Sequence, residues 1–162
     1  MTMRETTADQ EWGRLAEVEE GQREAQMLAR YTEVAALPEE ERQQRLRAMA
    51  EAEYALPDEL LRPFTKSRVR VWLQMEPEAA RTVARSYDRV MERMPGPVAM
   101  RRVAIVQTLA REFPQEDQQR LRDLVPGVFV GRDRQAQMAV DSPPPRAVEQ
   151  PRKKPWWAFW RR

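Results

Sequence analysis

The sequence predicts an all-α fold, a small bundle of about five to six helices with a disordered N-terminus and a proline-rich C-terminal linker and tail. Apolar residues recur at helical spacing, and prolines followed by acidic residues mark successive helix starts. The most apolar run, 97–113, carries on one helical face the residues Val98, Ile105, Val106, Leu109 and Phe113. We therefore expect this run to form the central helix, around which the others pack.

Composition and charge divide the chain into four parts. They are an acidic, partly helical N-terminal arm (1–24), a helical domain (25–130), a proline-rich flexible linker (131–155) and an aromatic–basic tail (156–162). Glycine costs about 1 kcal/mol relative to alanine inside a helix, so we expect the first helical pattern to break near Gly21. Residues 1–60 carry 15 acidic and 7 basic side chains, whereas residues 61–140 carry 9 and 15. This gradient favours either docking of the acidic arm on the basic domain or an anionic partner for the basic side.

Prolines set the predicted helix boundaries, because proline suits a helix start and the acids that follow it oppose the helix dipole. The pattern predicts helices over 38–54, 57–62, 66–75, 77–94, 97–113 and 114–125. The segments 37–47 and 113–122 resemble each other. An internal repeat and shared helix-start chemistry both explain that resemblance.

The segment 66–75 has two interpretations. Its apolar residues fit a helical stripe with Thr65 as the N-cap, which is the interpretation that its helical neighbours favour. Partial alternation around Val69, Val71 and Leu73 also fits a short strand, which would need 128–130 as its partner.

Composition argues against an enzyme. The chain has no cysteine and no histidine, so thiolate catalysis and the commonest general base and transition-metal ligand are excluded. None of the three serines has a nucleophile-elbow context, and no three glycines are spaced to cradle a phosphate. We therefore expect a protein without catalytic residues, cofactor or metal.

The C-terminal tail and the cations before it carry the most specific signal. Aromatic and basic side chains gather here without an acid: Arg152, Lys153, Lys154, Trp156, Trp157, Phe159, Trp160, Arg161 and Arg162. Indole rings favour the headgroup region of a bilayer, and each nearby cation adds about 1 kcal/mol at an anionic leaflet. A segment this short cannot cross a bilayer, so the pattern predicts reversible attachment to an anionic membrane surface.

Three other interpretations of the tail stay open. Arginine and tryptophan also suit single-stranded nucleic acid, through phosphate pairing and base stacking. The tail could dock tryptophan anchors into a protein groove. It could also fold back on the helical domain and cover an apolar patch.

A second candidate surface lies on the predicted helix 77–94 and the turn after it. Six arginines form it: Arg81, Arg85, Arg89, Arg93, Arg101 and Arg102. Acidic residues stand at helical pairing distance from several of them, so a solvated face competes with an anionic-partner face.

Together these patterns predict a non-catalytic adaptor or regulatory protein. We expect it to bind a protein partner through the helical domain and to attach to an anionic membrane through the tail. The alternative is a nucleic-acid-binding module that uses the arginine-rich 61–140 face and the tail. No signal sequence and no apolar run long enough to span a bilayer is apparent, so we expect a cytoplasmic protein, peripheral on the cytoplasmic face of the membrane.

Overall fold

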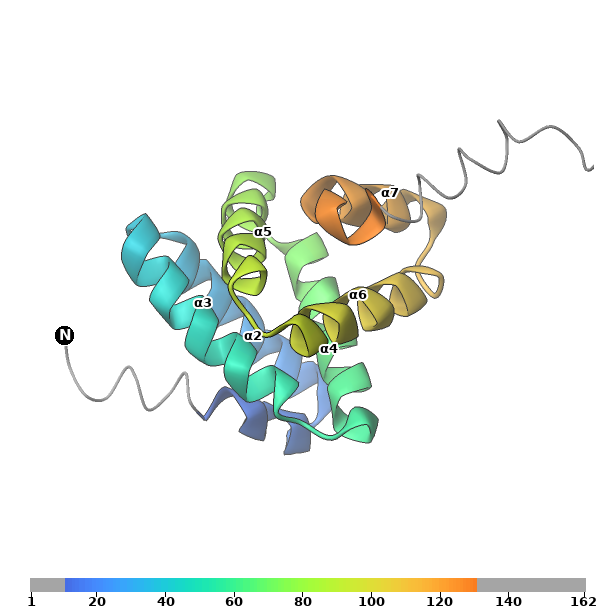
Figure 1. Cartoon of the computed structure of the whole chain (residues 1–162), viewed down its shortest axis with the longest axis horizontal. Coiled ribbons are helices and arrows are strands. Elements are labelled where there is room, and N and C mark those ends of the chain that lie inside the picture. The colour runs from blue at the N-terminus through green and yellow to red at the C-terminus, as the bar shows by residue number, and fades with distance from the viewer. Residues whose placement is uncertain (1–10, 131–162) are drawn as a thin grey trace, which may run out of the picture. The chain divides into compact units, whose positions relative to one another are not determined.

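The structure is a computed structural model and describes residues 11–130. These residues form helices and no strand, which confirms the all-α prediction (Figure 1). The elements are η1 (Trp12–Glu17), α2 (Glu20–Ala35), α3 (Glu39–Tyr54), α4 (Asp58–Gln74), α5 (Pro77–Glu92), α6 (Gly96–Ala110) and α7 (Gln115–Leu124). A further helical turn occupies 126–130.

The α-helices begin at a constant interval along the chain. Their N-cap residues are Glu19, Pro38, Pro57, Glu76, Pro95 and Pro114, so each N-cap lies nineteen positions after the one before it. An apolar residue precedes each N-cap: Val18, Leu37, Leu56, Met75, Met94 and Phe113. The similar segments 37–47 and 113–122 are four such intervals apart, so they occupy equivalent positions in one series. The chain is therefore an array of single-helix repeats, a solenoid-like arrangement in which neighbouring repeats bury each other's apolar faces.

Side-chain contacts recur with the same shift of one repeat. Two pairs of hydrogen bonds show it: Arg23 to Ser67 and Arg42 to Ser86, then Arg101 to the Tyr54 carbonyl and Arg120 to the Leu73 carbonyl. Shared helix-start chemistry does not explain these bonds, because their partners come from helices far apart in the sequence. The repeat thus extends from helix starts to the packing between helices.

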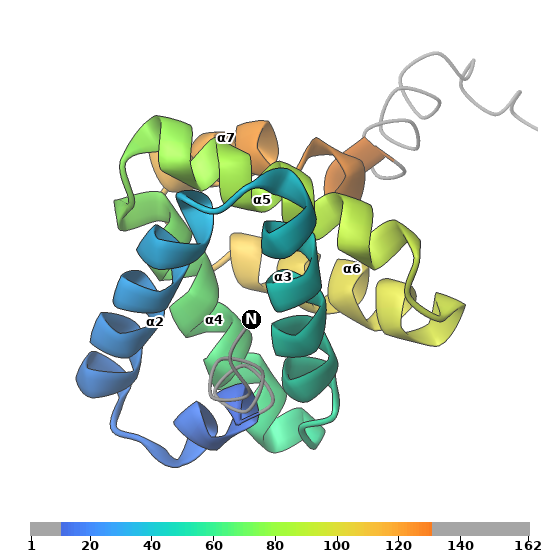
Figure 2. The same cartoon turned by 90° about the vertical axis from the view of Figure 1, so that its left-hand side faces the viewer.

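Each helix packs against the second helix after it. One row therefore consists of α2, α4 and α6, and the other of α3, α5 and α7 (Figure 2). Because α4 lies in the middle of its row and also borders the other row, it contacts every other element from η1 to α7. The centre of the domain is thus α4.

The prediction that 97–113 forms the central helix is wrong. Only four residues of α6 are buried, namely Arg102, Val106, Leu109 and Ala110, whereas nine residues of α4 are buried. The difference follows from the place of α6 at the edge of its row, where fewer of its apolar residues are covered.

The predicted break between 62 and 66 is absent, because α4 continues through Pro63. Proline removes one backbone hydrogen bond, here to the Glu59 carbonyl. Pro63 and Glu59 are both exposed, so that carbonyl lies on the solvent side of the helix. Residues 66–75 are helical as predicted, up to Gln74, but Thr65 is a buried residue inside α4 and not an N-cap.

The domain begins earlier than residue 25. Trp12 is 3% exposed and its ring packs edge-on against Tyr31 and Phe64. Residues 11–24 thus contribute to the core and do not form a separate arm. The helical conformation is interrupted between η1 and α2, close to Gly21. There the Glu19 carboxylate accepts hydrogen bonds from the backbone N–H groups of Gly21 and Gln22.

A chain of aromatic rings runs through the core. The rings meet edge to face, with centroids 5.2–6.0 Å apart, in the order Phe64, Trp12, Tyr31, Trp72 and Tyr87. Such pairs add about 0.5–1.5 kcal/mol each beyond their buried area. The chain links η1, α2, α4 and α5 into one packed unit.

Candidate functional site

The predicted arginine surface on α5 is mostly engaged with the domain itself. Arg81 pairs with Glu78 at 2.6 Å, Arg89 pairs with Glu39 of α3, and Arg93 donates to Gln43 at 3.5 Å. Arg85 is exposed and forms no ion pair with a described residue. The solvated-face interpretation therefore describes this stripe better than a free cationic surface.

Arg101 and Arg102 also point to partners within the domain. Arg101 bonds to Asp58 and to the carbonyls of Tyr54 and Leu56 at 2.9 and 3.0 Å, so it fastens α6 to the α3–α4 turn. Arg102 is buried, pairs with Asp88, and lies over the ring of Tyr87. The structure does not join these two residues to the α5 stripe as one open patch.

The most distinctive polar group of the domain is buried at its centre. The side chains of Glu53 on α3 and Arg68 on α4 are each 1% exposed, and the Arg68 Nε lies 3.1 Å from the Glu53 carboxylate. Thr65 and Tyr87 donate to the same carboxylate at 2.9 and 3.3 Å. The Arg68 guanidinium lies between Trp72 and Tyr87, 4.8 Å from each ring centroid.

This buried cluster shifts the ionisation of its members and neighbours. Burial opposes the charged form of the Arg68 guanidinium, but the Glu53 carboxylate outweighs burial, and the pKa of Arg68 lies well above its ordinary value. Burial, assisted by the charge of Glu53, raises the pKa of Tyr54 to about 12. Arg68 therefore stays charged and Tyr54 stays neutral near neutral pH. The cluster acts as a fixed charged contact that holds α3, α4 and α5 in register.

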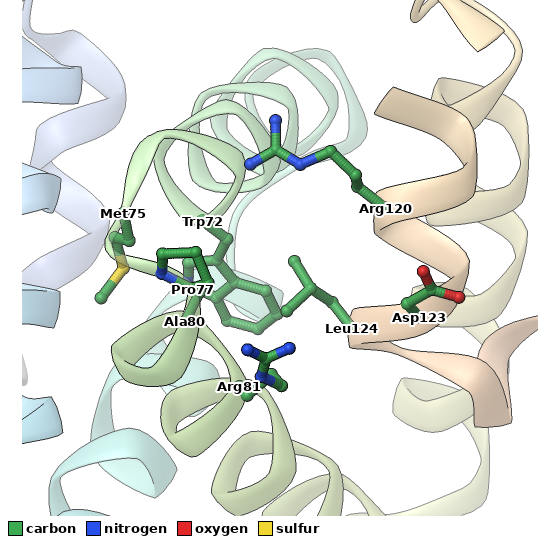
Figure 3. A pocket seen from close by; sticks show the side chains of 8 residues that line it. All are labelled: Trp72, Met75, Pro77, Ala80, Arg81, Arg120, Asp123 and Leu124. Carbon is green, nitrogen blue, oxygen red and sulfur yellow. The ribbon is translucent and has the colours of Figure 1, made fainter. Parts of the chain in front are cut away.

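A small hollow of about 120 Å³ lies among α4, α5 and α7 (Figure 3). Its lining consists of Trp72, Met75, Pro77, Ala80, Arg81, Arg120, Asp123 and Leu124. Arg81 and Arg120 enter the view from two different helices, on either side of Trp72. Sites for small molecules typically measure about 300–1,000 Å³, and both arginines already have partners, so this hollow is a packing feature of the array.

The outer face of α6 differs from those of the other helices because it carries no charge. The only charged residues of α6 are Arg101 and Arg102, both held by the contacts described above. We define the α6 outer face as the exposed residues Pro97, Met100, Ala104 and Thr108. Met100 is 70% exposed, and the Thr108 hydroxyl donates to the Ala104 carbonyl at 2.8 Å.

A separate groove lies on the side of α6 that faces α5, away from the α6 outer face. It has a volume of about 220 Å³ and lies among α5, the first half of α6 and the turn at 126–130. Five lining residues are uncharged and three are charged: Met91, Ala99, Val103, Gly127 and Val128, with Asp88, Glu92 and Arg102. Glu92 is exposed and has no ion-pair partner among residues 11–130.

Sequence reasoning did not identify the α6 outer face, although its signal is present. A helix of 15 residues with only two charged residues, adjacent to each other, cannot present a charged outer surface. Taken alone, the apolar run predicts a core helix. The predicted binding residues of the tail, from Arg152 to Arg162, and the predicted linker lie outside the described residues.

Two further kinds of site would leave a clear structural mark, a metal centre and a membrane span. Between residues 11 and 130, no three carboxylates come together as they would around a metal ion. None of the helices there is long and apolar enough to cross a bilayer.

Comparison with protein-family models, with curated proteins and with solved structures gives no match for this chain.

Proposed function

We propose that this protein is a non-catalytic adaptor or regulator. Its helical array binds a protein partner, and its aromatic–basic tail attaches it reversibly to an anionic membrane surface. One observation above all supports binding of a protein partner. The α6 outer face is exposed and uncharged, whereas most of the α5 and α6 arginines pair with acidic residues of the domain. Exposed apolar surface of this kind is typical of protein interaction sites.

The tail supports the second half. Its four aromatic side chains supply apolar contact, and its cations supply attraction to an anionic leaflet. Most arginines of α5 and α6 pair within the domain, so less cationic surface is left to contact phosphates. The nucleic-acid alternative is therefore supported less by the folded domain than by the number of arginines in the sequence.

Vesicle binding tests the membrane half of the proposal. The full chain should sediment with vesicles containing anionic lipid, and a truncation after Gln150 should not. Replacing Trp156, Trp157 and Trp160 by alanine should abolish binding even at low salt, because charge alone gives a weak, screened association. Neutralising Lys153, Lys154 and Arg162 should instead remove the preference for anionic over zwitterionic lipid. If the full chain ignores both kinds of vesicle, the membrane half of the proposal is wrong.

A further inference from the structure

The groove among α5, α6 and 126–130 has a filled counterpart one repeat earlier in the array. The residues nineteen positions before its lining are Val69, Trp72, Leu73, Ala80, Val83, Ala84, Thr108 and Leu109. All of them except Thr108 are buried. The helix α7 packs against α4 and α5, and its Leu124 lines one small hollow together with Trp72 and Ala80 (Figure 3). The groove therefore corresponds to the place that the next helix of the array would fill.

Burial differs between the two places. Ala80 and Ala84 of α5 are buried, whereas their counterparts on α6, Ala99 and Val103, are only half-buried. The groove is thus open within residues 11–130.

The sequence after residue 130 begins another repeat. Asp133 lies nineteen positions after Pro114, the N-cap of α7, and aspartate is among the preferred N-cap residues. A helix that starts there ends at or before Ser142, because Pro143 follows. Val140 lies seven positions after Asp133, and Ala136 lies one turn before Val140 on the same face. The seventh position after the N-cap is buried in every helix from α3 to α7: Arg45, Phe64, Val83, Arg102 and Leu121.

One departure from the repeat matches the groove in charge. Arg132 stands where an apolar residue precedes every other N-cap, and its counterpart is Phe113. Phe113 lines a hollow together with Leu73, and the counterpart of Leu73 is Glu92 at the groove. An arginine thus replaces the phenylalanine where a glutamate replaces the leucine. Opposite charges at such a rim set register more than affinity.

We propose that the chain's own segment 133–142 occupies this groove as the next helix of the row that contains α6. A helix this short is marginal in isolation, so docking and helix formation occur together. Residues 143–155 then connect the array to the aromatic–basic tail, over about 40 Å when extended.

Docking of this segment leaves the α6 outer face free for a protein partner. The counterparts of that face on α5 are exposed although α7 packs against α5: Glu78, Arg81, Arg85 and Arg89. The inference therefore goes beyond the proposed function without competing with it.

Hydrogen exchange of the full chain, measured by mass spectrometry, tests the proposal. We expect the amides of 134–142 to exchange at least about tenfold more slowly than in a synthetic peptide of residues 131–145. Val140→Asp should abolish this protection, and the control Val148→Asp should not. Val103→Arg should also abolish it, because the new side chain fills the groove. Its matched control, Ala104→Arg on the α6 outer face, should leave it unchanged.

Exchanging the two rim charges provides a second measurement. Glu92→Arg should weaken the protection of 134–142, and adding Arg132→Glu should restore it, because the opposite charges then face each other again. Circular dichroism confirms that each variant folds. If Val103→Arg unfolds the domain, Val140→Asp and this charge exchange still decide the proposal.

Three results would overturn the proposal. The first is exchange of 134–142 at the rate of the peptide. The second is protection that survives both Val140→Asp and Val103→Arg, or that Ala104→Arg removes as well. The third is protection that declines on dilution, because the segment then lies in the groove of a second copy. No vesicle enters these measurements, so this proposal and the membrane proposal fail separately.

Discussion

The helices α4 and α6 are similar in length but opposite in composition and place. α4 has six charged residues among 17, and it is the most buried helix of the domain. α6 has two among 15, and it lies at the end of its row with an exposed apolar face. How much of each of these two helices is buried thus depends on its position in the array and not on its hydrophobicity. A polar helix can occupy the centre when its cations find partners there, as Arg68 does with Glu53, whereas an apolar helix can lie at the edge of the array.

The largest expected effect concerns the buried ion pair of α4. Glu53→Gln leaves the Arg68 guanidinium buried without its counter-ion, and we expect a loss of about 3–5 kcal/mol in the free energy of unfolding. Urea denaturation followed by circular dichroism measures it. The double variant Glu53→Leu, Arg68→Met should recover much of that loss, because two apolar side chains need no pairing. A loss below about 1 kcal/mol for Glu53→Gln would show that burial in α4 does not depend on this pair.

Truncating one apolar residue in each helix compares them directly. Leu61 of α4 is fully buried, whereas Ile105 of α6 is half-buried. Leu61→Ala should cost about 2–5 kcal/mol and leave a cavity, and Ile105→Ala should cost about half as much. Thermal and urea unfolding of the two variants measure the difference. Equal losses would contradict the peripheral place of α6.

Trp12→Ala tests whether the core extends to η1. The ring contacts Tyr31 and Phe64, so its removal should cost about 3 kcal/mol or more. Arg14→Ala is the control, because that side chain is exposed and only a surface pair with Glu11 is lost. If Trp12→Ala is as stable as the control in urea, residues 11–24 contribute nothing to the domain.

A smaller effect is expected at the exposed start of α3. Hydrogen bonds from Arg42, then from Gln43 and Arg89, lower the pKa of Glu39 from 4.5 to about 2. Because the pKa of Glu39 is lower in the folded state, its carboxylate stabilises the fold at pH values above the ordinary pKa of 4.5. This stabilisation is lost as the pH falls towards about 2. Because Glu39 is partly exposed, Glu39→Gln should cost no more than about 1 kcal/mol at neutral pH. The difference between wild type and variant should fade as pH falls between these two pKa values, as urea titrations at several pH values would show.

The smallest effect is expected on the α6 outer face. Met100→Lys should change the free energy of unfolding by no more than about 0.5 kcal/mol, because the side chain is exposed. Urea denaturation followed by circular dichroism measures the difference from wild type. A strongly destabilised variant would mean that the face contributes to the fold and is not free for a partner.

Much of this fold could be predicted from the sequence. The pattern of a proline followed by acidic residues located the starts of α3, α4, α5 and α7 to within one residue. It failed at Pro63, because a proline on the exposed side of a helix removes one bond without ending the helix. The centre was misplaced because an apolar run was equated with burial, whereas the pairing of Arg68 with Glu53 depends on residues that only the folded chain brings together.

The candidate site was harder to predict than the fold. The arginine surface was inferred from spacing along α5, but its main partners, such as Glu39, come from α3, far earlier in the chain. The repeat was visible in principle, since an apolar residue followed by proline or glutamate recurs at a constant interval from Val18 to Phe113. The similarity between 37–47 and 113–122 alone reveals neither this interval nor the position of α6 in its row.

The two alternating rows also determine how this chain can change in length. Inserting or deleting one repeat would move every later helix into the opposite row, so that each would face the wrong neighbours. Inserting or deleting two consecutive repeats would keep each helix in its own row and would change only the number of helix pairs. Duplication of residues 57–94, which contain α4 and α5, is therefore the smallest kind of internal extension that would preserve the existing interfaces. The smallest change of length that keeps both rows is thus a pair of helices, although the sequence repeats with every single helix.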